Sequence, residues 1–220
     1  MPEGKPIARR DEGLHRLFFA LWPGDALRDA IAAAAADLER AHAPGGRRSR
    51  AERYHLTLQF LGDFRPLPRS VLDAARAAAN SVRLPAFELV LDHAGSFPGS
   101  RVWWLGTGET PAQLRLLNEA LGSALGRSGV AIKPSVGFIP HLTIQRNVNR
   151  PIAPITIATL RWPVREFVLV DCVPGGISPY RIAGRWPVIL PSSSMAASRA
   201  LASGILPSPT PAGSALRATS

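Results

Sequence analysis

The sequence predicts an α+β protein made of two similar halves. The pentapeptides HLTLQ (55–59) and HLTIQ (141–145) lie 86 positions apart, and the same shift places the apolar residues 17–19 on 103–105. Chance agreement of His, Leu, Thr and Gln at matching offsets has odds on the order of one in a thousand at average residue usage. A hydrophobic content of 46% in 220 residues is enough for one sizeable core. Each half is therefore expected to contain a strand, a helix and a histidine-bearing strand.

The first half opens with a short apolar segment, 16–23, which predicts a buried strand. The segment 24–42 has helical periodicity, and Asp25 is its expected N-cap. A polar, glycine-rich loop follows at 43–53 and carries several arginines. They are Arg47, Arg48, Arg50 and Arg53. These arginines could contact an RNA backbone, and a solvated surface loop is the alternative.

The first histidine motif lies in a segment, 54–63, whose alternation predicts a strand. One face is expected to carry Leu56, Leu58 and Phe60, and the other His55, Thr57 and Gln59. A helix over 68–82 and a strand over 86–99 complete this half. Phe97 near the end of that strand is interpreted as a buried ring in a turn, with stacking on a nucleic-acid base as the alternative.

The second half repeats this series. Strands are expected at 101–108, 137–146, 165–174 and 176–190, the last as a strand or hairpin. The helix over 109–129 is expected to have Thr110 as its N-cap and Pro111 at its first position. Trp103 and Trp104 are interpreted as core and surface neighbours on one strand.

Both ends of the chain differ in composition from the middle. Residues 1–13 are polar and are expected to be disordered, and 191–220 form a tail rich in Ser, Ala, Pro and Gly with no sustained pattern. The sequence therefore predicts one domain over 14–190, with its internal repeats at about 14–100 and 101–190.

Composition restricts the class of protein. The formal net charge of +10 is weak support for a phosphate-bearing substrate, because a basic surface in contact with solvent is the common alternative. Cys172 is the only cysteine, so an intrachain disulfide and a Cys-rich metal site are excluded. The chain begins without the apolar core of a secretory signal and has no apolar run of roughly 18 residues. We expect a cytoplasmic monomer.

The repeated motifs carry the groups needed for acid–base chemistry on a phosphate. Alternation places His55 beside Thr57 on one strand face, and His141 beside Thr143 on another. A single histidine in a strand is usually structural, but two in matching contexts indicate a paired role. Imidazoles can act as base and acid at neutral pH, and threonine hydroxyls can hold phosphate oxygens between them.

A zinc site is the rival interpretation, since histidine is a common metal ligand. The chain has no Cys cluster and no His-x-x-x-His, and neither motif contains a carboxylate. Catalysis without a metal or another cofactor is therefore favoured. His15, His42 and His93 lie outside the repeated pattern and are expected to be structural or solvated.

Four segments, spread in order over 14–190, also resemble a known family. They are RLFFALWP, RYHLTLQFLGD, FIPHLTIQR and LVDCVPGGISPYRI. Together they resemble the RNA 2′,3′-cyclic phosphodiesterases, formerly called 2′-5′ RNA ligases, in the two-histidine phosphoesterase superfamily. The resemblance implies a bilobal α+β fold with two antiparallel sheets facing a central cleft and helices packed outside.

The resemblance also implies metal-independent hydrolysis of a terminal 2′,3′-cyclic phosphate, on RNA ends or nucleotides, to a 2′-phosphomonoester. It implies that His55 is the acid towards the leaving 3′ oxygen and that His141 activates water, although the near-symmetric pair leaves the two roles interchangeable. Thr57 and Thr143 match the phosphate-binding threonines. Three alternatives stay open: a 2′-5′ RNA ligase, a phosphodiesterase of small cyclic nucleotides, and a non-catalytic module that binds RNA ends.

Arg146 matches a phosphate-holding basic residue of the family, but its position raises a difficulty. In a regular strand it lies five residues after His141 and so on the opposite face. It reaches the cleft only if the strand ends, twists or bulges there, and a surface arginine is the alternative. Phe60 occupies the matching place after the first motif.

Overall fold

A computed structural model describes the part of the chain that carries the predicted repeats. The described residues are 13–97, 99–130, 137–174 and 179–188. Met1–Ile189 belong to one compact unit, and the second unit, Leu190–Ser220, lies outside the described residues. The disorder expected for 1–13 and 191–220 therefore concerns residues that, apart from Gly13, lie outside the description.

The three α-helices lie where their periodicity predicts them, and a short 3-10 helix lies in the segment 43–53 that was expected to be a loop. They are α1 (Asp25–His42), the short 3-10 helix η1 (Ala51–Arg53), α2 (Arg69–Ser81) and α3 (Ala112–Arg127). Both expected N-caps are wrong, because Gly24 precedes α1 and Pro111 precedes α3 in the cap positions. Asp25 is instead the first helical residue, where a negative charge favours the positive end of the helix dipole, and its carboxylate accepts a 2.7 Å hydrogen bond from Arg28.

Nine strands are described. They are β1 (His15–Leu21), β2 (Arg47–Arg48), β3 (Leu56–Phe64), β4 (Phe87–Ser96), β5 (Val102–Gly106), β6 (His141–Arg146), β7 (Ile155–Val164), β8 (Glu166–Cys172) and β9 (Tyr180–Pro187). Sequence reasoning did not anticipate β2 or β7. The long strand β7 contains Pro163 and lies at the end of the sheet, where the missing N–H of a proline is tolerated.

The strands form one antiparallel sheet in the order β7-β4-β5-β6-β3-β1-β8-β9, with β2 paired to β6. This confirms the α+β class and the antiparallel strands. Where two sheets were expected, the strand groups β7-β4-β5-β6 and β3-β1-β8-β9 are joined between β3 and β6 by the single pair Leu56–Leu142.

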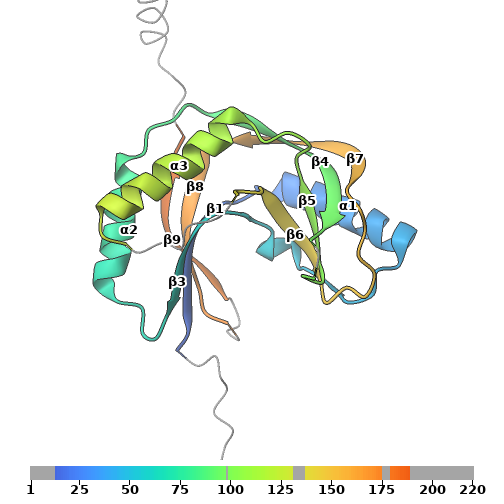
Figure 1. The fold of residues 1–220 in the computed structure, drawn as a ribbon, viewed down its shortest axis with the longest axis horizontal. Helices are drawn as coiled ribbons and strands as arrows, with labels where there is room; N and C mark the ends of the chain where they lie inside the picture. Colours follow the sequence, from blue (N-terminus) through green and yellow to red (C-terminus); the bar gives the residue numbers. More distant parts are fainter. Residues whose placement is uncertain (1–12, 98, 131–136, 175–178, 189–220) are drawn as a thin grey trace, which may run out of the picture. The chain divides into compact units, whose positions relative to one another are not determined.

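The sequence repeats exchange elements across this sheet (Figure 1). Helix α1, which follows β1, packs against β6 and β7, whereas α3, which follows β5, packs against β3. Likewise β4 pairs with β5, and β8 pairs with β1. The strand order therefore does not follow the division near residue 100.

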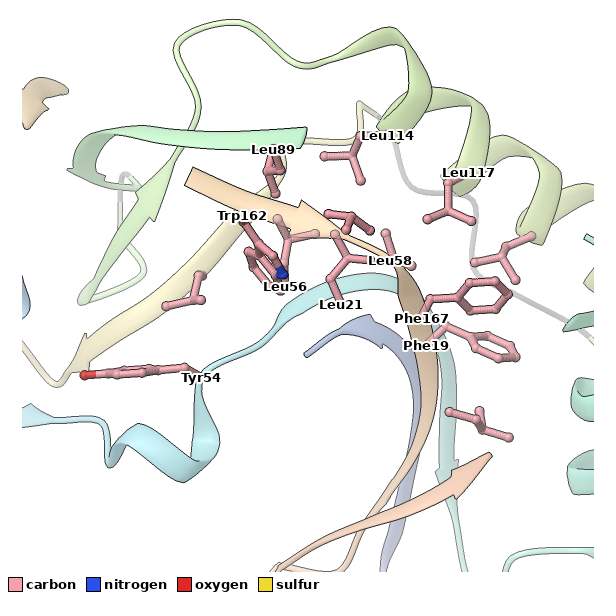
Figure 2. Packing of buried hydrophobic residues seen from close by; sticks show 14 of the residues in the cluster. Phe19, Leu21, Tyr54, Leu56, Leu58, Leu89, Leu114, Leu117, Trp162 and Phe167 are labelled. Atoms are coloured by element: carbon pink, nitrogen blue, oxygen red, sulfur yellow. The ribbon is translucent and has the colours of Figure 1, made fainter. Parts of the chain in front are cut away.

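The main core lies between the sheet and its helices. Figure 2 shows Leu21, Phe19 and Phe167 from the sheet together with Leu114 and Leu117 of α3. A smaller apolar cluster covers the other face of β1 and β8. It contains Phe18, Ala20, Val168, Val170 and Cys172, with Trp22, Tyr180 and Ile182 packed against it. This second face is the one that carries the first histidine motif.

Candidate active site

The two motif strands meet at Leu56 of β3 and Leu142 of β6, the pair that joins the two strand groups. In antiparallel register the positions on either side face each other. Continued by one position in each direction, this register places His55 opposite Thr143 and Thr57 opposite His141. The histidine of each motif is therefore placed across from the threonine of the other.

A β-bulge follows the first motif threonine. On β3, Thr57 pairs with Ala20 and Gln59 pairs with Phe19, so Leu58 is an extra residue without a partner on β1. A bulge changes which face the following side chains occupy. Gln59 is consequently buried, at 9% exposure, and Phe60 is 42% exposed. The expected alternation, with Phe60 beside the leucines and Gln59 beside the histidine, is wrong.

The second motif contains the same bulge. On β6, Thr143 pairs with Trp104 and Gln145 pairs with Trp103, which leaves Ile144 without a partner on β5. These pairings also correct the alignment of the repeats, because Phe19 corresponds to Trp103 at a shift of 84 residues rather than 86. A difference of two residues keeps the same strand face.

The bulge resolves the position of Arg146. With Ile144 unpaired on β5, both Ile144 and Gln145 are buried, and the arginine after them is exposed. Arg146 lines the same pocket as His55 and Thr143. Its positive charge contributes to a lowered pKa of both motif histidines.

This pocket has a volume of about 270 Å³ and a strongly basic lining. The lining residues are Arg47, Arg48, Ser49, Arg50, Arg53, His55, Thr143, Arg146 and Tyr180. His141 and Thr57, although half-buried at the junction of the same two strands, are not part of this lining. The structure thus brings three of the five predicted site residues into one pocket.

Both motif histidines have the same ring orientation. The Nδ1–H of His55 donates a hydrogen bond to the Arg53 carbonyl oxygen at 2.7 Å, and that of His141 donates to the Ile139 carbonyl oxygen at 2.9 Å. A carbonyl oxygen only accepts, so each Nδ1 carries the proton and each neutral ring has its lone pair on Nε2. Among the described residues neither Nε2 has a hydrogen-bond partner, so each lone pair can accept a proton.

Burial keeps both rings neutral at physiological pH. It lowers the pKa of His55 from 6.5 to about 4, against the opposing effect of the hydrogen bond to Arg53, with smaller contributions from the charges of Arg146 and His141. Burial also lowers the pKa of His141, and Arg146 adds to this effect. A bound anion would oppose the influence of the arginine on both rings.

Aromatic rings surround His55. Trp22 stacks on it with ring centroids 5.6 Å apart and an interplanar angle of 12°, while Phe18 and Tyr180 lie at 5.0 and 5.6 Å. Sequence reasoning did not assign a site role to these three residues. The signal was present, since all three lie in segments that carry the family resemblance.

The surroundings of His141 differ. The ring of Phe97 contacts it edge-on at 4.8 Å and tilts against Trp104 at 5.4 Å, so Phe97 lies beside the second motif rather than only in a turn. Trp104 is buried, which corrects its expected surface position. Its ring fits against Gly95, where a Cβ atom would lie 2.6 Å from the indole.

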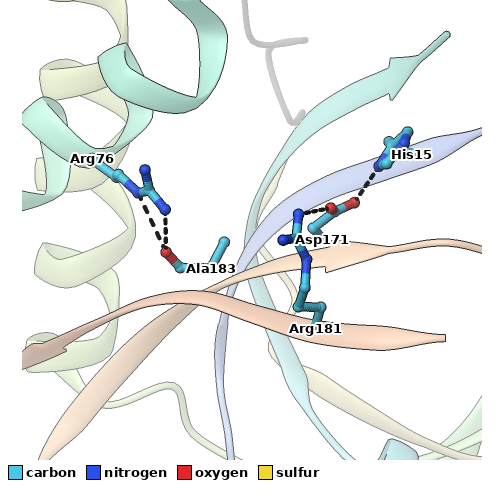
Figure 3. A network of polar contacts seen from close by, with 5 residues as sticks. All are labelled: His15, Arg76, Asp171, Arg181 and Ala183. Carbon is cyan, nitrogen blue, oxygen red and sulfur yellow. Dashed lines mark hydrogen bonds and ion pairs between the residues drawn. The ribbon is translucent and has the colours of Figure 1, made fainter. Parts of the chain in front are cut away.

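The other histidines lie outside the pocket. His15 Nδ1 is 2.8 Å from the buried carboxylate of Asp171, which also accepts a 2.7 Å hydrogen bond from Arg181 (Figure 3). His93 is hydrogen-bonded to Asp92 at 2.7 Å. Among the described residues, no group of three or more His, Cys, Asp or Glu side chains is arranged to hold a metal ion, and no described helix is long and apolar enough to cross a membrane.

Fold and site together define an antiparallel α+β protein with two histidine motifs joined at the junction of its strand groups, beside a basic pocket. The family model of the 2′-5′ RNA ligase superfamily matches residues 25–173. An RNA 2′,3′-cyclic phosphodiesterase of Escherichia coli is 33% identical over 176 residues, which cover 78% of this chain and 95% of that protein. The chain belongs to the 2′-5′ RNA ligase superfamily.

Solved structures agree with this assignment. The crystal structure of Escherichia coli LigT complexed with 3′-AMP has a TM-score of 0.67 and 30% sequence identity, covering 80% of this chain and 98% of LigT. A protein of Thermus thermophilus has a TM-score of 0.62 and 29% identity, covering 80% of this chain and all of the other.

Proposed function

We propose that this protein hydrolyses the terminal 2′,3′-cyclic phosphate of RNA to a 2′-phosphomonoester. The observation that carries the proposal is the matched state of the two motif histidines, His55 and His141. Each ring donates its Nδ1–H to a backbone carbonyl, which leaves the lone pair on Nε2, and His55 lines a pocket rich in arginines. The similarity to the Escherichia coli RNA 2′,3′-cyclic phosphodiesterase supports the same reaction.

In the proposed reaction, His141 Nε2 accepts a proton from water as the water oxygen attacks phosphorus. The bond from phosphorus to the 3′ oxygen breaks, and His55 supplies the proton that the departing oxygen needs. Because His55 is neutral in the free enzyme, its proton must be taken up with the substrate. The negative charge of the phosphodiester favours this uptake, since it opposes the charge of Arg146 that lowers the pKa of His55.

The remaining residues would hold the phosphate. The Thr143 hydroxyl and the Arg146 guanidinium line the pocket beside His55, and both can donate hydrogen bonds to the non-bridging oxygens. Thr57 is proposed to do the same from its place across from His141. Such donors stabilise the charge that develops on phosphorus oxygens in the transition state.

The decisive experiment measures hydrolysis of a 2′,3′-cyclic nucleotide in excess EDTA by wild type, His55→Ala and His141→Ala. We expect each variant to lose about 10²- to 10⁴-fold in kcat. His42→Ala, a change at an exposed histidine outside the pocket, is the matched control and should retain activity. Undiminished turnover in either motif variant would remove that histidine from the mechanism, and loss of activity with EDTA would replace it with metal chemistry.

A second substrate assigns the two roles. A phosphodiester with a p-nitrophenyl leaving group needs no protonation of the departing oxygen, so it should rescue the variant that lacks the acid. We expect partial rescue of His55→Ala and none of His141→Ala. The opposite pattern would exchange the roles.

Two further enzymatic activities would use the same pocket: 2′-5′ ligation of RNA ends, and hydrolysis of small cyclic nucleotides. Analysis of products from defined 2′-5′ and 3′-5′ isomers separates them from the proposed reaction. Tight binding of RNA ends with no turnover would instead indicate a binding module. We propose that the protein acts as a cytoplasmic monomer. Light scattering after size-exclusion chromatography tests the monomeric state.

A further inference from the structure

A second cavity lies next to the active-site pocket. It is an open groove of about 850 Å³. Its lining residues are Ala32, Ala36, Arg47, Arg48, Ser49, Arg50, Ala51, Glu52 and Tyr54. We call it the α1 groove because Ala32 and Ala36 come from that helix. Residues 47–50 line both the α1 groove and the active-site pocket, so the two cavities share one arginine-bearing wall.

This wall is fixed to the catalytic strand. Arg47 pairs with Arg146 and Arg48 with Gln145 across β2 and β6, and the Ser49 N–H donates a 2.8 Å hydrogen bond to the Ile144 carbonyl oxygen. The wall therefore has a defined position relative to the second histidine motif.

The arginines of the wall are only partly neutralised by acidic side chains. Arg48 forms a 3.4 Å ion pair with Glu39, but within the described part of the chain the guanidinium groups of Arg47 and Arg50 have no side-chain partner. The groove itself contains a single acidic residue, Glu52. Guanidinium groups match the geometry of phosphate oxygens, which makes a run of unpaired arginines suited to a phosphodiester chain.

A tyrosine adds a polar group to the lining of the groove. Tyr54 is 1% exposed, and Figure 2 shows its hydroxyl oxygen pointing away from the apolar cluster. Tyr54 lines the α1 groove, and its hydroxyl has no hydrogen-bond partner among the described residues. The hydroxyl oxygen is open to the groove rather than fully buried, so it can donate a hydrogen bond to a phosphate oxygen there.

We propose that the α1 groove binds the sugar–phosphate backbone on the 5′ side of a terminal cyclic phosphate. The preferred substrate is then an oligoribonucleotide rather than a mononucleotide. This inference rests on the proposed function, because it assumes that the cyclic phosphate occupies the pocket. Small side chains at Ala32 and Ala36 leave the helix side of the groove open to a backbone, and the arginines of the wall face the phosphates.

The test compares 2′,3′-cyclic mononucleotides with oligoribonucleotides of two to five residues that end in the same cyclic phosphate. We expect kcat/KM to rise with length and then level off once the groove is filled. Ala36→Glu adds a negative charge to the groove and should lower the ratio of oligonucleotide to mononucleotide kcat/KM by about tenfold, equivalent to about 1.4 kcal/mol. Tyr54→Phe should lower the same ratio by a smaller factor.

Two control variants are needed. The first separates the effect of the added charge from that of the added side-chain size, and the second separates a local effect of charge from a general one. Ala36→Gln has nearly the shape of Ala36→Glu without its charge, and Ala77→Glu makes the same change at an exposed position of α2. Both should leave the ratio near that of wild type. A fall with Ala36→Gln equal to that with Ala36→Glu would show that bulk, not charge, is responsible, and would overturn the electrostatic part of the proposal.

Salt dependence supplies a second readout. Each phosphate of a single-stranded nucleic acid that a protein contacts changes the slope of log K against log salt by about −0.7. Two additional phosphates in the groove should therefore steepen the slope of log kcat/KM by about 1.4 units for the longer substrate. Equal slopes for mononucleotide and pentanucleotide would contradict the proposal.

The outcomes distinguish the two proposals. Hydrolysis of mononucleotides with no dependence on length overturns the groove and leaves the proposed function intact. If no cyclic phosphate is hydrolysed, the proposed function fails, and the groove is judged by anisotropy with a fluorescent pentaribonucleotide. Equal affinity of wild type and Ala36→Glu in that measurement would overturn the groove as well.

Discussion

The side-chain amide of Gln59 donates hydrogen bonds to two oxygen atoms of Asn118, at 2.8 Å to the backbone carbonyl and 2.7 Å to Oδ1. Gln145 makes an equivalent anchor, because its Nε2 donates to the Gly45 carbonyl oxygen at 2.7 Å. Each glutamine follows a β-bulge, which turns it into the core. The two glutamines thus tie the histidine strands to elements of the opposite sequence repeat, and this explains why the repeated motif extends beyond histidine and threonine.

Gln59→Leu tests this anchor. The substitution removes both donors and leaves the side chain of Asn118 buried without its partner, which costs about 1 to 3 kcal/mol of the free energy of unfolding. Urea denaturation followed by fluorescence should show this loss. Adding Asn118→Leu should restore part of it, because a pair of apolar residues leaves no amide unsatisfied. A double variant as unstable as the sum of the single variants would show that the two side chains do not act as a pair.

The elements that sequence reasoning predicted are those with a strong local pattern. The three α-helices and the two histidine strands follow their hydrophobic periods, and the histidine repeat pointed to the junction of β3 and β6. The bulges could not be predicted from alternation, since nothing in HLTLQ or HLTIQ distinguishes an unpaired Leu58 or Ile144 from a paired one. That limit explains both the wrong face for Phe60 and the open question about Arg146.

The sequence pattern also could not predict that the two repeats exchange elements. Which strand a helix covers depends on long-range packing, and the repeats alone favour a helix that packs on its own half. The positions of Tyr180 and Trp22 at the site were missed because an aromatic residue in a strand is usually interpreted as a core residue. Only the fold places their rings against His55.

Stability should fall in mild acid because of His55. Its pKa is about 4 in the folded protein and near 6.5 in an unfolded chain. Below pH 6.5 the unfolded chain binds a proton at this histidine that the folded protein does not bind. The stabilisation of the folded state by neutral His55 is therefore complete above pH 6.5 and is lost as pH falls towards 4. We expect wild type to lose about 2 kcal/mol between about pH 7.5 and 5.0 from this group.

His55→Gln isolates that contribution. The variant cannot titrate at this position. In matched urea titrations over the same pH range, its free energy of unfolding should therefore fall by about 2 kcal/mol less than that of wild type. His141 titrates in both proteins and therefore cancels in the comparison. Parallel curves for wild type and His55→Gln would show that the pKa of His55 is close to that of a solvated histidine.

Arg146→Gln should change both binding and the pH profile. Loss of a charged donor to phosphate costs about 2 kcal/mol, or about 30-fold in kcat/KM. Because the guanidinium lowers the pKa of His55 and His141, removing it should raise both values and move the acid limb of kcat/KM to higher pH. Arg165→Gln, at an exposed arginine outside the pocket, should do neither. An unchanged acid limb in Arg146→Gln would place the guanidinium away from the histidines.

Gly95→Ala should disturb the second motif through packing alone. The new Cβ atom would lie 2.6 Å from the ring of Trp104, which is buried and contacts Phe97, the ring that packs on His141. Overpacking of this kind costs about 1 to 3 kcal/mol and shifts the neighbouring rings, so both the melting temperature and kcat should fall. Gly126→Ala is the contrasting control: it lies in α3 with open space around its Cβ, and alanine there should stabilise by about 0.5 to 1 kcal/mol. If Gly95→Ala melts at the wild-type temperature, Trp104 has room to move, and the rings do not fix the position of His141.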